Sequence, residues 1–505
     1  MYWTADKHGF WWATRATPLA ALVGSSPDLP LLLAELSLSG VDVRHTDGPY
    51  NGVRRVPPGH ALVVDDGSYE AKVTSLHRPG TRNLLDGTDA VRDAVTAAVT
   101  RRAKSWERIS TDLSGGIDSG CVTSVAASTR PLMAVTYTDT HMRGCDDVPY
   151  ARRLAAAVGG IAHELVDGST ADVRHFDGLA DPDQLPSTDT PSLATALLAI
   201  KGAQLAPAVA YGSQAHLTGR GGDNVLDAVN TRLVDQYLAG DRRTAFLRTT
   251  DYARSRLTAP WRMWWQLCNT AKQSYPNALE RLAHGISAGI SEPRSGPTGP
   301  QLLWCSPTRA ARWLTPTGRA LVTELISTRS RAATGQITPA VLHERLALEW
   351  MANSHAQFAE IARQRWNLAI HAPLLDTTVV DACLSIPSYE RVRPGTYKPL
   401  AQAAFTGLVP RWLLGRGTKT DFTTSLYEGL ARNASTLRQI LKSSLLAEAG
   451  LLDQQRILAD LDRAVAGADA PLAHLHTLVV TELWVRRLPT NYATWWQTEE
   501  VPAWR

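Results

Sequence analysis

Apolar residues in the first 83 positions occur in short runs that end at turn residues. Ala61 to Val64 is one such run, and Asp65-Asp66-Gly67 follows it directly. Short apolar runs bounded by glycine, proline and aspartate predict antiparallel strands. From about Asp86 the apolar positions recur at helical spacing as far as Arg102. This change of pattern predicts a domain boundary between Arg78 and Asp86.

The next part of the chain alternates between apolar runs and helical spacing. The runs predict strands at residues 108–113, 132–137, 163–166 and 215–218. Helices are predicted at 119–127, at 146–158 with Asp146 as the N-cap, and around Leu193, Leu197 and Ile200. Strands that alternate with helices need right-handed crossover connections, so the sequence predicts a parallel sheet.

The remainder of the chain, from Thr231 onward, shows mainly helical spacing. One segment there contains three tryptophans, Trp261, Trp264 and Trp265. Tryptophan is largely buried in folded proteins, so we expect this helix to pack on the sheet and not to form a substrate-binding surface.

Composition places the chain among globular proteins. Its 505 residues are 44% hydrophobic and 20% charged, which excludes disorder and allows two to four domains of roughly 150 residues each. The net charge of +4 gives no basis for nucleic-acid binding. Runs of ~20 apolar residues, as a membrane helix needs, are absent. The N-terminal residues do not resemble a signal peptide, so we expect a cytoplasmic protein.

Cysteine chemistry is an improbable basis for the function. The five cysteines are scattered and include no Cys-x-x-Cys pair. This pattern argues against both a disulfide framework and a cysteine-based zinc site.

The residues that follow the first predicted parallel strand predict a phosphate-binding loop. Gly115 and Gly116 allow backbone N–H groups to approach a polyanion, Ser114 and Ser119 add hydroxyl donors, and the next helix adds its positive end. The motif G-x-x-x-x-G-K-[ST] does not occur in the sequence. A carboxylate beside bound phosphates normally requires a cation.

Two aspartates supply such carboxylates. Asp118 lies within the first loop, and Asp223 ends the glycine-rich segment 218–223 after the fourth strand. Because ligands of parallel sheets bind beyond the carboxyl ends of the strands, the two aspartates are predicted to hold Mg²⁺ together with phosphate oxygens and water.

Four segments of the chain resemble motifs of the asparagine synthetase family. Residues 114–119 (SGGIDS) resemble its pyrophosphate loop, 218–223 (TGRGGD) its second nucleotide loop, 371–376 (HAPLLD) its P-F-L-D segment, and 416–422 (RGTKTDF) its Arg-x-x-Lys segment. The resemblance covers most of the chain from Asp86 to about Leu488. It implies an α/β fold with two domains: a truncated, degenerate glutaminase-like antiparallel β domain at 1–83 and an ATP-pyrophosphatase synthetase domain at 86–505.

Departures from the family pattern indicate the branch. The chain begins Met1-Tyr2-Trp3, whereas glutamine-dependent members begin with a nucleophilic cysteine, so the nitrogen nucleophile is expected to be an amine of the substrate. Arg220 stands where asparagine synthetases have Glu and β-lactam synthetases have Tyr, and Asn224 replaces the usual Glu. Residues 188–192 and 422–430 are instead similar to the lasso peptide cyclases.

That branch activates an Asp or Glu side chain of a precursor peptide as an acyl-adenylate, which the N-terminal amine of the peptide attacks to form a macrolactam. The resemblance implies ATP and Mg²⁺ as cofactors and a precursor peptide as substrate. A leader-recognition protein and a leader peptidase are the implied partners, and no nucleic acid or membrane is expected.

The resemblance also implies roles for individual residues. Those expected to hold the β and γ phosphates of ATP are Ser114, Gly115, Gly116 and Ser119. Those expected to hold Mg²⁺ are Asp118 and Asp223, and those expected to frame the adenine are Thr136, Tyr137, Thr218 and Gly219. Three more are expected to act in the reaction: Lys419 on the charge that develops during amine attack, Lys398 on phosphate, and Asp189 on the amine or the substrate backbone.

Two other functions stay open at this stage. One is an asparagine synthetase-like amide ligase that acts on a small acid with ammonia or an amine. The other is a catalytically silent scaffold for a modification complex. The presence of Asp118, Asp223 and Lys419 argues against the scaffold.

Overall fold

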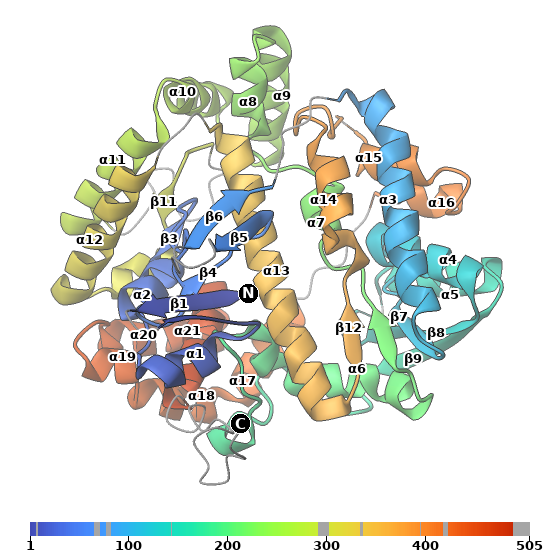
Figure 1. Ribbon diagram of the computed structural model, residues 1–505, viewed down its shortest axis with the longest axis horizontal. Helices are drawn as coiled ribbons and strands as arrows, with labels where there is room; N and C mark the ends of the chain where they lie inside the picture. Colours follow the sequence, from blue (N-terminus) through green and yellow to red (C-terminus); the bar gives the residue numbers. More distant parts are fainter. Residues whose placement is uncertain are drawn as a thin grey trace.

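A five-stranded parallel sheet forms one half of the molecule (Figure 1). The computed structural model describes residues 1–6, 9–64, 71–76, 82–142, 144–290, 302–333, 337–393, 395–417 and 423–487. The sheet has the order β12-β10-β7-β8-β9. Its strands are β7 (Ile109–Asp112), β8 (Leu132–Thr138), β9 (Ile161–Asp167), β10 (Ala215–Leu217) and β12 (Ala369–His371). The first four confirm the strands predicted from the sequence, and β12 was not predicted.

Helices cover this sheet through apolar side chains. Those that pack on it or on one another around it are α3 (Leu84–Lys104), α4 (Ile117–Thr129), α5 (Asp147–Ala157) and α6 (Leu198–Ala210). Asp146 precedes α5 as predicted, but its side chain makes no capping hydrogen bond. Val91, Val95 and Val99 of α3 recur at helical spacing and are fully buried, so the apolar face of α3 belongs to the core of this half.

The second half of the molecule is helical. Its elements before the fifth parallel strand are α8 (Arg232–Leu238), α9 (Arg242–Ser255), α10 (Pro260–Ala271), α11 (Tyr275–Ser287) and α12 (Pro316–Ala332), and α13 (Pro339–Trp366) follows them. Its elements after the fifth strand are α17 (Thr423–Arg432), α18 (Ala434–Lys442), α19 (Leu445–Glu448), α20 (Gln454–Val465) and α21 (Leu472–Arg486). Four further helices pack with α3 and α4 in the core of the sheet half: α7 (Gly222–Val225), α14 (Thr377–Leu384), α15 (Pro399–Phe405) and α16 (Arg411–Leu414). The short 3-10 helices are η1 (Pro182–Gln184), η2 (Leu193–Leu197), η3 (Arg309–Trp313) and η4 (Pro373–Leu375).

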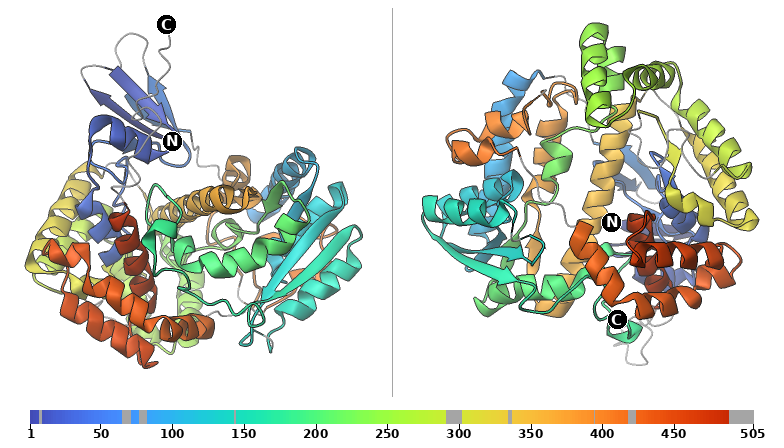
Figure 2. Two further views of the ribbon diagram at one scale, coloured as in Figure 1. Left: turned by 90° about the horizontal axis from the view of Figure 1, so that it is seen from below. Right: turned by 180° about the vertical axis from the view of Figure 1, so that it is seen from behind.

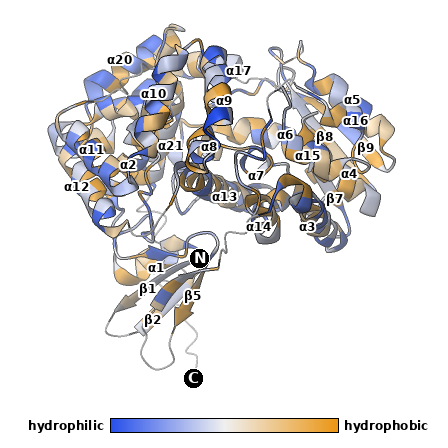
Figure 3. Ribbon diagram, turned by 90° about the horizontal axis from the view of Figure 1, so that it is seen from above, coloured by the Kyte–Doolittle hydropathy of each residue, from blue (hydrophilic) through white to orange (hydrophobic). Residues whose placement is uncertain are grey.

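The long helix α13 lies between the two halves (Figure 1). Pro339 occupies its first turn, where a missing N–H costs nothing, and Asn367 ends it in the left-handed conformation. Figure 3 shows hydrophilic and hydrophobic residues interspersed on the outer helices α9 to α12, as expected for helices with one buried face.

The N-terminal segment forms a small antiparallel sheet that projects from the helical half (Figure 2, left). It has the order β2-β1-β4, from β1 (Tyr2–Asp6), β2 (Gly9–Ala13) and β4 (Arg54–Arg55), and a hairpin of β5 (His60–Val64) and β6 (Ala71–Ser75) follows. Antiparallel strands were predicted here, whereas the helices α1 (Ala16–Val23) and α2 (Leu29–Ser37) were not.

This N-terminal segment shares its apolar contacts with the rest of the chain. The rings of Tyr50 and Trp484 of α21 are 5.7 Å apart, and Trp484 Nε1 donates to the Thr188 carbonyl at 2.9 Å. Leu33 and Leu36 of α2 belong to the core of the helical half. A short antiparallel pair, β3 (Leu38–Ser39) with β11 (Ser306–Pro307), joins the same regions.

The expectation that the tryptophan-rich helix packs on the sheet is wrong. Helix α10 packs against α8 and α9. Trp264 contacts the rings of Tyr237 and Phe246 edge-on, whereas Trp261 and Trp265 are 68% and 67% exposed. Helices α8 and α9 cover one side of α10, and the side that carries Trp261 and Trp265 stays exposed.

One stretch of the described residues is long and apolar enough to cross a membrane, judged by length and composition alone. It is Leu193–Ala210, which comprises η2 and α6. In the structure α6 packs against β8 and β9 and carries Lys201. The helical part of this stretch therefore covers the parallel sheet.

A buried ion pair fixes the helices around the parallel sheet. Arg391 is fully buried, and its Nη2 lies 2.5 Å from Glu344 Oε1 on α13. The same guanidinium donates to the carbonyl oxygens of Ile386, Val225 and Asp227. It therefore joins α13 to the ends of α7 and α14.

Replacement of this arginine is expected to destabilise the fold. Arg391→Met leaves the Glu344 carboxylate buried without its partner, so the free energy of unfolding should fall by about 3–5 kcal/mol. Urea unfolding followed by circular dichroism measures this, with the exposed Arg393→Met as control. The double variant Arg391→Met/Glu344→Leu should recover part of the loss. Equal midpoints for Arg391→Met and Arg393→Met would contradict the assigned role.

Candidate active site

The candidate site lies where the strand order of the parallel sheet reverses. Chain order runs outward from β7 through β8 and β9 on one side, and through β10 and β12 on the other. β7 and β10 are adjacent, with Thr111 opposite Leu217. Loops that leave such neighbouring strands in opposite directions form a crevice at their carboxyl ends, which is the usual ligand site of this architecture.

The loop after β7 has the geometry of a phosphate cradle. Gly116 is the N-cap of α4, so the first N–H groups of this 13-residue helix point toward the loop. Ser114 Oγ and Ser119 Oγ lie 2.9 Å apart, and Ser114 N donates to Ser119 Oγ at 3.2 Å. The predicted residues Ser114, Gly115, Gly116 and Ser119 therefore meet at one helix end. Their phosphate-binding role stays a prediction.

Arg416 fastens this loop from a distant part of the chain. Its Nη1 donates to the Gly115 carbonyl at 2.7 Å, and its Nη2 lies 2.5 Å from Asp147 Oδ1. Gly115 has φ +79°, and a Cβ there would lie 2.2 Å from the Asp147 carbonyl oxygen. Sequence reasoning missed Arg416 as a site residue, although it begins the Arg-x-x-Lys segment. Only its buried contacts reveal the role.

The loop after β10 touches the first loop through glycine. A Cβ on Gly219 would lie 2.6 Å from the Ser119 backbone nitrogen, and one on Gly222 would lie 2.1 Å from Asp118 Cγ. A side chain at either position would overlap these atoms. The glycines of 218–223 therefore allow the two nucleotide loops predicted from the sequence to come into contact.

Lys398 lies between the two predicted metal ligands. Its Nζ is 2.5 Å from Asp118 Oδ2 and 2.7 Å from Asp223 Oδ1, and its side chain is 1% exposed. Burial alone would lower the pKa of Lys398, but the two carboxylates outweigh burial and hold this pKa above its ordinary value. The ammonium group is therefore charged at neutral pH. Lys398 also has φ +48° at the start of α15.

The residues present fit a magnesium ion. Asp118 and Asp223 direct oxygens at the same nitrogen, so two carboxylates already converge on one cation. The described residues contain no group of three or more histidine, cysteine, aspartate and glutamate side chains suited to a metal. Further ligands would come from phosphate oxygens and water, which is the usual coordination of Mg²⁺. When bound there, Mg²⁺ supplies charge neutralisation to a leaving pyrophosphate.

The residues predicted to frame the adenine lie at the same edge of the sheet. Thr136 Oγ1 donates to the Leu113 carbonyl, and burial raises the pKa of Tyr137 to about 12. Thr218 N donates to the His371 carbonyl at 2.8 Å, next to Gly219. The threonine side chains are buried, so contact with adenine would have to come from the backbone or from Tyr137.

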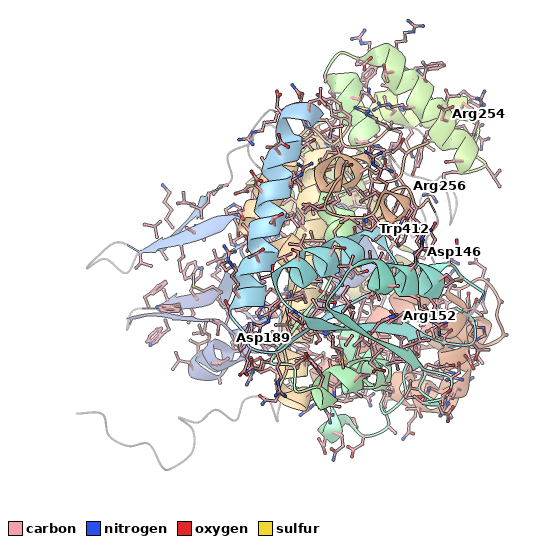
Figure 4. All side chains as sticks on the ribbon, turned by 90° about the vertical axis from the view of Figure 1, so that its right-hand side faces the viewer. Asp146, Arg152, Asp189, Arg254, Arg256 and Trp412 are labelled. Atoms are coloured by element: carbon pink, nitrogen blue, oxygen red, sulfur yellow. The ribbon has the colours of Figure 1, made fainter. Side chains whose placement is uncertain are left out.

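Asp189 lies on the side of the molecule that carries the N-terminal strands (Figure 4). Its Oδ1 accepts hydrogen bonds from Thr17 Oγ1 at 2.9 Å and Thr17 N at 3.2 Å, and Arg15 Nε is 3.6 Å away. These contacts join Asp189 to the start of α1 and not to the phosphate loop. Its predicted role toward the substrate amine is untested.

Lys419, the predicted catalytic lysine, lies outside the described residues, which end at 417 and resume at 423. Its role stays a prediction from the resemblance.

Contact between the two loops is expected to be necessary for nucleotide binding. Gly219→Ala places a methyl group against the Ser119 backbone, which forces the loops apart and should weaken ATP binding about 10-fold. Equilibrium titration with a fluorescent ATP analogue measures the dissociation constant. Gly159→Ala is the control, because a Cβ there has no neighbour within 4 Å. Unchanged ATP affinity in Gly219→Ala would show that the close approach is not needed.

Comparison with known proteins agrees with this architecture. A family model described as asparagine synthase matches residues 90–486. No curated protein matches the chain. The matched region includes the parallel sheet, both glycine loops, Lys398 and Arg416. Members of the family are ATP-dependent amide or C–N ligases that generally require Mg²⁺. The chain belongs to the asparagine synthase family.

Proposed function

We propose that this protein uses ATP to join a side-chain carboxylate of a peptide to the N-terminal amine of the same peptide. In the first step, a carboxylate oxygen attacks the α-phosphorus of ATP and pyrophosphate leaves. In the second step, the amine nitrogen attacks the acyl carbon, AMP leaves, and the nitrogen loses a proton. The product is a macrolactam that has lost one water relative to the linear peptide.

Family membership and the site geometry support the ligase part of this proposal. The phosphate loop 114–119 lies beside two carboxylates that share one buried ammonium group. This arrangement suits the release of pyrophosphate from ATP. Lys419 is proposed to stabilise the charge that develops during amine attack.

A large cavity is the observation that carries the peptide part of the proposal. It has a volume of about 770 Å³ and lies between the N-terminal segment and α13. Pockets of roughly 300–1,000 Å³ hold ligands much larger than ammonia or a single small acid. The cavity is lined by apolar residues and by charged side chains such as Arg44, Arg55, Glu349 and Asp189, a mixture suited to a peptide backbone and its side chains.

Helix α13 connects this cavity with the nucleotide loops. Asn353 and Gln357 line the cavity. Ser354, the residue after Asn353, accepts a hydrogen bond from Arg220 of the second loop at 2.9 Å. The cavity and the loop thus meet adjacent sides of one helix, since successive helical residues are rotated by about 100°. A peptide in the cavity would have a short route to the loops.

Ring closure places a demand on this cavity. An acyl-adenylate hydrolyses in water unless the amine is held close to it, and well-oriented intramolecular partners reach effective molarities of ~10⁵–10⁸ M. The proposed work of the cavity is to fold the peptide and exclude water. A leader-recognition protein and a leader peptidase are the proposed partners, because they would deliver the processed peptide.

Mass spectrometry tests the proposal. The protein, ATP and Mg²⁺ are incubated with leader-free peptides that carry a free N-terminal glycine and one Asp or Glu. We expect loss of one water from the substrate, with one AMP and one pyrophosphate per ring. Asp118→Asn, Asp223→Asn and Lys419→Met should each reduce ring formation about 100-fold or more. Asp251→Asn, an exposed site on α9, is the control.

Other outcomes favour the other functions. Nucleotide turnover with small acids and ammonia, but with no peptide, would identify a small-molecule amide ligase. Product formation that survives Asp118→Asn and Lys419→Met in a modification complex would identify a scaffold.

A further inference from the structure

A cation-rich cluster lies beside the nucleotide loops, outside the phosphate and metal contacts described above. Its members are Asp112 at the end of β7, Lys201 of α6, His216 of β10, Arg220 of the second loop, and Phe358 of α13. Asp112 precedes Ser114 by two residues, and Arg220 follows Gly219, which touches Ser119. The cluster therefore adjoins the phosphate loop at the switch point of the sheet.

The single carboxylate of this cluster has hydrogen-bond partners that do not include Lys201 or Arg220. Asp112 Oδ1 accepts from Gln204 Nε2 at 2.8 Å and lies 3.1 Å from His216 Nε2. Lys201 Nζ donates to the neutral Gln204 Oε1 at 2.7 Å, and Arg220 Nη2 donates to the Ser354 hydroxyl at 2.9 Å. Neither cation has a carboxylate within ion-pair distance in the described part of the chain.

Both cations are half-buried beside one aromatic ring. Lys201 Nζ lies 5.7 Å and Arg220 Cζ 5.4 Å from the centroid of Phe358. Burial lowers the pKa of both groups, and Asp112 offsets this only in part. Two half-buried cations near one carboxylate leave an excess of positive charge that an added anion would compensate.

A neutral histidine completes the surroundings of Arg220. Burial, Arg220 and His371 together lower the pKa of His355 to about 4. His355 Nδ1 is buried and has no hydrogen-bond partner among the described residues. This nitrogen is able to form a hydrogen bond with a polar ligand or with water near Arg220.

We propose that Lys201 and Arg220 bind the carboxylate that is to be activated. The assignment rests on the proposed ligase function and specifies its acyl substrate: a free, unmodified carboxylate. The planar guanidinium of arginine suits a carboxylate, which it binds through two parallel hydrogen bonds. Asp118, Lys398 and the 114–119 loop already supply the groups suited to the phosphates and their metal. Because Gly219 approaches Ser119, a carboxylate at Arg220 would lie at the same end of the sheet as those groups, where attack on the α-phosphorus requires it.

Ligand-observed NMR with capped amino acids tests this site. N-acetyl-aspartate α-methylamide and its glutamate analogue each carry one free carboxylate, and the asparagine and glutamine counterparts are their neutral controls. Each is titrated into the full-length protein with Mg²⁺ and a non-hydrolysable ATP analogue. We expect at least one acid to bind about 10-fold or more tightly than its neutral counterpart.

The variants test the assigned residues. Lys201→Gln and Arg220→Gln should each weaken binding of the acid about 10-fold and change the affinity for the ATP analogue less than 2-fold. Retained ATP-analogue binding also shows that the variants are folded. The exposed Lys104→Gln and Arg243→Gln should leave both affinities unchanged. Arg220→Lys should lose acid affinity despite its retained charge, because the bidentate geometry is lost.

Three results would overturn the assignment. They are equal binding of acid and neutral probe, unchanged acid affinity in both variants, and an equal loss of ATP-analogue affinity, which would assign the cluster to the nucleotide phosphates. If the ring-closure assay fails while the capped acids still bind as expected, the peptide substrate is rejected and the carboxylate site is retained. The two proposals therefore fail separately.

Discussion

The burial of one ammonium group between two carboxylates organises this molecule around its candidate active site. Lys398 belongs to the segment that begins α15, Asp118 to the first turn of α4, and Asp223 to the first turn of α7. The buried ammonium group of Lys398 would be costly without the two carboxylates that contact it. Their shared contact therefore fixes the positions of three helix starts that are far apart in the sequence.

The absence of a side chain at three glycines allows the two loops to come close enough for that contact. Gly115, Gly219 and Gly222 each occupy a position where a side chain would collide with the backbone or with Asp118. The loops after β7 and β10 can then approach until both aspartates reach Lys398. Arg416 adds a second buried link by binding the Gly115 carbonyl and Asp147. The phosphate cradle is thus held from outside its own strand and helix.

The positive charges of the site fall into two groups with different surroundings. Lys398 is compensated by two carboxylates, whereas Lys201 and Arg220 share the neighbourhood of a single one, Asp112. The first group is suited to the metal-bound end of ATP, and the second to an added anion. Helix α13 passes the second group and also lines the cavity beneath the N-terminal strands. Under the proposed function, the nucleotide, the acyl group and the peptide would occupy separate places around this helix.

The sequence by itself determined the elements whose pattern is local. Four parallel strands, the glycine loops and the long helical region follow from apolar spacing and turn residues, because these depend on neighbours in the chain. Strand β12 was missed because three residues, Ala369–His371, carry no periodicity. The exposure of Trp261 and Trp265, the link from Asp189 to Thr17, and the positions of Lys398 and Arg416 were decided by tertiary structure. Each depends on contacts between residues more than 100 positions apart or on which helix face remains uncovered, and a local pattern cannot encode such contacts.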